Sequence, residues 1–148
     1  MTNELLDFLR AQLDEDERVA QEASGDAWVT GASAGYEYSR PGDVYAIAHD
    51  GTPARIAQGT RCGPDISAEQ SSEHIARHDP ARVLAEVEAK QRILDEHHPT
   101  VYGDGSRPDC YCCSDKRGDD VERYPCLTVR LLALPYADRP GYQEAWRP

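Results

Sequence analysis

The chain has 148 residues, of which 39% are hydrophobic and 29% charged, a size that suits a single domain (1–148) with one moderate core. Its 27 acidic and 16 basic residues give a net charge of -11, which makes binding to nucleic-acid phosphates unlikely. No apolar run approaches the ~20 residues of a membrane span, and residues 1–7 are acidic where a secretory signal would be basic, so we expect a cytoplasmic protein with no membrane segment.

Hydrophobic periodicity predicts a helix and then a small sheet in the first part of the chain. Apolar side chains recur at helical spacing over residues 3–23. Within 27–60, short segments separated by turn residues predict an antiparallel sheet of two to four strands, with a hairpin turn at Asp50-Gly51 and a Gly- and Ser-rich loop over 30–35. The apolar face of the predicted helix consists of Leu5, Leu6, Leu9, Leu13 and Ala20.

Residues 67–98 predict two consecutive helices. A capping box begins at Ser67. The second helix is expected to start at Asp79-Pro80, because Asp caps a helix and Pro suits its first turn. A further short helix is predicted over 127–134, followed by a tail whose aromatic rings pack across the body. The rings of that tail belong to Tyr136, Tyr142 and Trp146.

Four of the five cysteines lie close together in the sequence, downstream of two adjacent histidines. Their spacing, His-x12-Cys-x2-Cys-x12-Cys, favours zinc, which prefers tetrahedral sulfur and nitrogen ligands. Residues 99–126 contain few apolar side chains, so burial cannot order this segment and a metal would supply the organising energy. Since four protein ligands leave no open position for water, we predict a structural zinc ion. The predicted ligands are His97, Cys110, Cys113 and Cys126.

Several alternatives to this ligand set stay open. Cys112 can replace Cys113 as a ligand, and His98 can replace His97. The cysteines can also be free thiols, or form a disulfide or redox pair, although a reducing compartment disfavours disulfides. Cys62 is isolated in the sequence and is expected to be unligated.

These elements together predict an α+β fold: an N-terminal helix, a small antiparallel sheet, two central helices, a zinc-stapled loop and a short C-terminal helix. The predicted sections of the single domain are a sheet over 27–60, a helical pair over 67–98, a metal-binding loop over 99–126, and a terminal helix and tail over 127–148.

Long segments of the chain resemble an uncharacterised family of short actinobacterial and actinophage proteins, a domain of unknown function. The resembling segments are 5–19, 73–90, 131–138 and 142–148. The resemblance implies a histidine at the end of the central helix, then Cys-x-x-Cys, then Pro-Cys before the final helix. It implies no catalytic residues. In this sequence those positions are His97, Cys110, Cys113 and Pro125-Cys126, and Cys112 is a departure from the pattern.

Two classes of function are consistent with these features. The first is a small acidic, non-enzymatic accessory or interaction protein with a structural zinc ion. Its partner would be another protein, with a homodimer through the N-terminal helix as a further possibility. The second is a small metal-dependent hydrolase or nucleotide-processing enzyme. The enzyme would need either a cleft with perturbed carboxylates or an open metal position, for which His74 and His78 are candidates. These two histidines are four residues apart on a predicted helix but lack a third ligand in the sequence.

Overall fold

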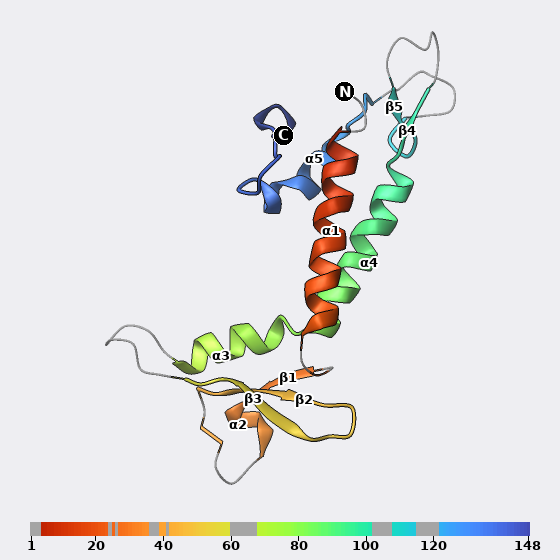
Figure 1. Ribbon diagram of the computed structural model, residues 1–148. Coiled ribbons are helices and arrows are strands. Elements are labelled where there is room, and N and C mark those ends of the chain that lie inside the picture. The colour runs from red at the N-terminus through yellow and green to blue at the C-terminus, as the bar shows by residue number, and fades with distance from the viewer. Residues whose placement is uncertain are drawn as a thin grey trace. The chain divides into compact units, whose positions relative to one another are not determined.

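The computed structural model describes residues 4–23, 25, 27–35, 39–40, 42–59, 68–101, 108–114 and 122–148. It confirms an α+β fold with a small antiparallel sheet (Figure 1). In chain order the elements are α1 (Glu4–Glu22), β1 (Ala27–Thr30), α2 (Gly31–Ala34), β2 (Val44–Ile47), β3 (Pro53–Ala57), α3 (Ala68–Arg77), α4 (Pro80–Glu96), β4 (Pro99–Thr100), β5 (Asp109–Cys110), α5 (Leu127–Ala133), η1 (Leu134–Tyr136) and η2 (Glu144–Trp146).

The chain divides into two compact units. The metal-centre unit comprises residues 1–15 and 87–148, and the sheet unit comprises residues 16–86. Helices α1 and α4 each contribute one part to each unit. The prediction of a single domain stays a prediction.

In the metal-centre unit, the first turns of α1 lie beside the last turns of α4 (Figure 1). Leu5, Leu9 and Leu13 of α1 are at most 2% exposed. Leu94 of α4 is buried as well, as is Val87. Complete burial of one such side chain stabilises a fold by roughly 1.5–3 kcal/mol. The leucine periodicity therefore predicts the buried face of α1 correctly.

The C-terminal tail packs on the N-terminal part of α1 through aromatic rings, as predicted. The ring of Phe8 lies 5.3 Å from that of Trp146 and 6.1 Å from that of Tyr142. Arg130 of α5 donates from Nε to the Trp146 carbonyl oxygen at 3.1 Å. Trp146 is buried in consequence, and the tail completes the core of this unit.

In the sheet unit, β1, β2 and β3 form an antiparallel sheet in that order, and α3 contacts β1 and β2. Val44 and Ala46 of β2 are buried, as alternation on a half-buried central strand requires. The predicted hairpin turn is confirmed: Gly51 has φ +81°, and the Thr52 amide donates to Asp50 Oδ1 at 2.8 Å.

The loop expected over 30–35 is instead a four-residue helix, α2. Tertiary contacts fix this short helix: the Gly31 amide donates to the Asp43 carbonyl oxygen at 2.7 Å, and Ser39 Oγ donates to the Gly31 carbonyl oxygen at 2.8 Å. A Cβ at Gly31 would lie 1.8 Å from the Arg40 carbonyl oxygen, so only glycine fits there. Gly35 ends the helix with φ +67°. The predicted capping box at Ser67 lies outside the described residues.

Asp43 is a fully buried carboxylate at the start of β2. The Gly59 amide donates to its Oδ1 at 3.0 Å, and Arg55 Nη1 lies 3.4 Å from its Oδ2. Burial by itself raises the pKa of Asp43. The hydrogen bonds from Gly59 and Arg55 and the charge of Arg55 outweigh burial, so the pKa lies below its ordinary value of 3.8.

The lowered pKa of Asp43 predicts an acid-sensitive sheet unit. A carboxyl with a lower pKa in the folded than in the unfolded state stabilises the fold above its unfolded pKa, and this contribution is lost as the pH falls through the folded pKa. We expect the free energy of unfolding to decline below about pH 4. The Asp43→Asn variant should have a free energy of unfolding about 1–3 kcal/mol lower than the wild type near neutral pH. Its free energy of unfolding should also fall less steeply as the solution is made acidic. Urea unfolding, followed through amide NMR signals of β1–β3, measures both. A free energy of unfolding in the Asp43→Asn variant equal to that of the wild type would contradict this account.

Candidate metal centre

Three cysteine sulfurs surround one histidine nitrogen in the metal-centre unit. The Sγ atoms of Cys110, Cys113 and Cys126 each lie 3.4 Å from Nδ1 of His97. All four donor atoms lie within 4.8 Å of one another. An imidazole nitrogen carries one proton or one lone pair, so it cannot form three hydrogen bonds at once. The arrangement instead matches ligands around a common centre. Tetrahedral zinc, with its usual bond lengths, places sulfur and nitrogen about 3.6 Å apart.

Local backbone structure positions each donor. His97 directly follows the last residue of α4, and β4 then pairs with β5 so that Pro99 lies opposite Cys110. The Ser114 amide donates to the Cys110 carbonyl oxygen at 3.0 Å, which closes a turn containing Cys113. Cys126 is the N-cap residue of α5. Donors that are far apart in sequence therefore converge at the junction of two helices and a small sheet.

Polar side chains outside the donor set hold the segments together. Ser114 is buried, and its Oγ accepts a hydrogen bond from the Glu122 amide at 3.0 Å and donates to the Glu122 carbonyl oxygen at 3.2 Å. Arg123 Nη1 pairs with the buried carboxylate of Asp109 at 2.9 Å. Glu122 Oε1 also accepts a hydrogen bond from the Leu127 amide at 2.9 Å. The segment around residue 122 is thus fixed both to the Cys110 turn and to the start of α5.

The thiols lie in an environment that opposes ionisation unless a cation is present. Burial raises the pKa of Cys113, and hydrogen bonding with Cys110 raises it further. Burial likewise raises the pKa of Cys126, although the Val129 amide acts in the opposite direction. Burial also raises the pKa of the neighbouring Tyr124 to about 12. A bound divalent cation would reverse this balance for the thiols, because a coordinating thiol loses its proton.

The structure distinguishes between the alternative donors left open by the sequence. Cys112 is exposed and is not part of the donor group. His98 stacks on Tyr111, with ring centroids 4.6 Å apart, and its Nδ1 donates to the Asp95 carbonyl oxygen at 2.7 Å. None of the four described cysteines forms a disulfide. Cys62 lies outside the described residues.

Sequence reasoning misses the residues that support the donors. Ser114, Glu122, Asp109 and Arg123 are isolated polar residues in a segment that the sequence predicts to be a loop. Their roles come from contacts across the chain, such as the bridge between Asp109 and Arg123. The one local signal is Glu122, a carboxylate shortly before the start of α5, where acceptors for helix amides are favoured.

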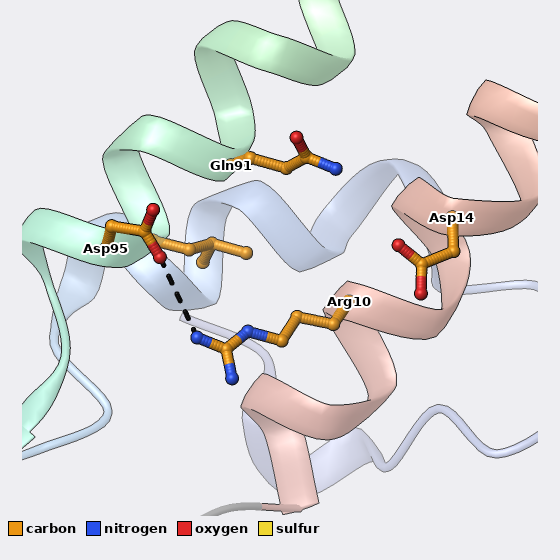
Figure 2. Close-up of a pocket in the computed structure, with 5 residues that line it drawn as sticks. Arg10, Asp14, Gln91 and Asp95 are labelled. Carbon is orange, nitrogen blue, oxygen red and sulfur yellow. Dashed lines mark ion pairs between the residues drawn. The ribbon is translucent and has the colours of Figure 1, made fainter.

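A second feature of the metal-centre unit is a hollow of about 240 Å³ between α1 and α4 (Figure 2). Arg10 reaches across it toward Asp95, and their closest atoms are 3.7 Å apart. Both side chains are more than half exposed, so this pair contributes little to stability. The remaining lining residues are Asp14, Gln91 and Leu94. The hollow has a mixed charge and no set of metal donors comparable to the Cys110 region.

His74 and His78 lie exposed on and just after α3 in the sheet unit. Their ring centroids are 4.4 Å apart, and His78 Nδ1 donates to the His74 carbonyl oxygen at 2.8 Å. Within the described ranges, the one group of three or more metal donors is the group around His97. The two histidines therefore remain a pair without a third ligand there.

Comparisons with known proteins identify a family but no function. None of the helices in the described part of the chain is long and apolar enough to cross a membrane. No curated protein and no solved structure matches the chain. A family model described as a family of unknown function (DUF6221) matches residues 2–148, and the chain therefore belongs to that family.

Proposed function

We propose that the protein is a small acidic, non-enzymatic accessory or interaction protein, in which a structural zinc ion bound by His97, Cys110, Cys113 and Cys126 holds the described residues between 97 and 126 in place. The observation that carries this proposal is the arrangement of three sulfurs, each 3.4 Å from one imidazole nitrogen. Thiolate ligands with one imidazole in a tetrahedral arrangement are typical of zinc sites.

Burial in this segment supports a structural role for the ion. The buried residues described between 97 and 126 are Asp109, Cys110, Ser114, Tyr124 and Cys126. None of these five residues is aliphatic, and the nearby Val101 is 63% exposed. Hydrophobic burial therefore offers little energy to offset the entropy lost when the segment becomes ordered. Binding of zinc to such a site contributes directly to the free energy of folding.

The donor count favours a non-enzymatic site. Catalytic zinc sites have three protein ligands and keep one position for water or substrate. A site closed by four protein donors leaves no such position. The enzyme alternative requires an open metal position elsewhere, and His74 and His78 supply only two donors. We therefore favour the accessory class, acting in the cytoplasm, where reduced thiols are available to bind metal.

Surface properties support another protein as the partner. The net charge of -11 disfavours nucleic acid. Leu127 and Leu131 lie one turn apart on α5 and are 51% and 48% exposed. Exposed apolar side chains that adjoin one another favour protein contacts, and a homodimer is one form that such a contact can take.

Metal analysis of two variants tests this proposal. We expect wild-type protein to retain one zinc ion per chain after dialysis. Cys113→Ser should lose most of the zinc and melt at a lower temperature, because serine is a poor zinc ligand. The matched variant His78→Ala should keep the zinc content and melting temperature of the wild type. Zinc that is lost in His78→Ala but retained in Cys113→Ser would instead favour the enzyme class.

A further inference from the structure

The three sulfur donors of the metal centre differ in their access to solvent. Cys110 and Cys126 are 0% and 1% exposed. Cys113 is only half-buried. A solute that reacts with a zinc-bound thiolate must reach its sulfur, so reactivity follows exposure as well as thiolate character. Among the three sulfur donors, Cys113 is therefore the one that a small oxidant reaches first.

A second thiolate lies within reach of Cys113. Cys110 precedes it by three residues, in the turn closed by the hydrogen bond from the Ser114 amide to the Cys110 carbonyl oxygen. That bond joins residue 114 to residue 110, so the five residues 110–114 form one helical α-turn. In such a turn residues three apart are neighbours, with Cβ atoms about 5–6 Å apart. Disulfides span Cα separations of about 4.4–6.8 Å. Both Sγ atoms also face the same nitrogen, His97 Nδ1.

We propose that Cys113 is the site at which hydrogen peroxide oxidises the metal centre, with Cys110 as the resolving thiolate; this inference rests on the zinc site proposed above. The Cys113 thiolate attacks one peroxide oxygen, the O–O bond breaks, and Cys113 becomes a sulfenic acid while hydroxide leaves. The Cys110 thiolate then attacks the Cys113 sulfur, forms an S–S bond and expels a second hydroxide. Two thiolates are oxidised and one peroxide is reduced. Zinc loses two of its four ligands and is released.

Treatment of the purified, zinc-loaded chain with hydrogen peroxide tests this inference. Released zinc is followed with a chromogenic chelator, and disulfides are mapped by mass spectrometry after free thiols are blocked. We expect zinc release to coincide with a Cys110–Cys113 disulfide, and a thiol reductant with added zinc to reverse both changes. The control Cys112→Ser should release zinc at a rate within about twofold of wild type, because Cys112 is exposed but is not a donor.

Two results would overturn this inference but leave the proposed function intact. One is oxidation confined to Cys112 while zinc stays bound. The other is a first-formed disulfide that contains Cys126. A protein that contains no zinc before peroxide is added would contradict the proposed function as well, so the two failures are distinguishable.

Discussion

Replacement of Cys126 by serine is expected to remove zinc and to destabilise the metal-centre unit by about 3 kcal/mol or more. The Cys126 side chain is 1% exposed, and its sulfur lies 3.4 Å from His97 Nδ1. Serine preserves the size of the N-cap residue of α5 and accepts hydrogen bonds from helix amides, so the loss would not come from capping. It would come from the missing thiolate. Chemical unfolding of the wild type and the variant in the presence of zinc measures the difference.

Cys112→Ser is the matched control for this variant. It makes the same chemical change two residues from Cys110, at an exposed position outside the donor group. Substitutions at such surface positions usually change stability by less than about 0.5 kcal/mol. Equal destabilisation by the two serine variants, or full zinc retention in Cys126→Ser, would show that Cys126 does not hold the ion.

The fold was predictable where the hydrophobic period extends over several turns. Leu5, Leu9 and Leu13 mark the buried face of α1 because a helix returns to the same face every three to four residues. Asp79 and Pro80 mark the start of α4 for local reasons, and Asp79 Oδ1 does accept a hydrogen bond from the Arg82 amide at 2.8 Å. Each of these signals lies within the element that it predicts.

Elements fixed by distant contacts were not predictable. The helix α2 depends on the hydrogen bond between Gly31 and Asp43, and β4 and β5 are each only two residues long and pair with each other. Segments this short carry no periodicity. The Gly-Ser composition of α2 and the polar composition around β5 both indicate a loop.

The candidate site, too, combines features that have a local sequence signal with features that depend on distant contacts. The spacing of His97 and the cysteines predicts four metal donors, and the structure brings the donor atoms of those four residues together. Spacing alone does not choose between Cys112 and Cys113. That choice comes from the turn after Cys110, which places the residue three positions later, rather than two, on the same side. The contact between Ser114 and the Glu122 backbone had no sequence signal, because it joins two segments whose meeting depends on the fold.

The central claim is that zinc, and not hydrophobic burial, orders the described residues between 97 and 126. Removal of the ion from the intact protein with a chelator should therefore disorder this segment and leave the sheet unit folded. The first turns of α1 bury several leucines and should retain their helical structure. The expected effect is large, since zinc binding to small structural sites is worth about 10–16 kcal/mol.

The most direct measurement is the amide NMR spectrum of the chain before and after zinc removal. We predict that the signals of residues 97–101, 109–114 and 122–126 collapse toward random-coil positions, that the signals of β1–β3 stay in place, and that one equivalent of zinc restores the original spectrum. Unchanged signals for these three ranges after complete removal of the metal would contradict the account.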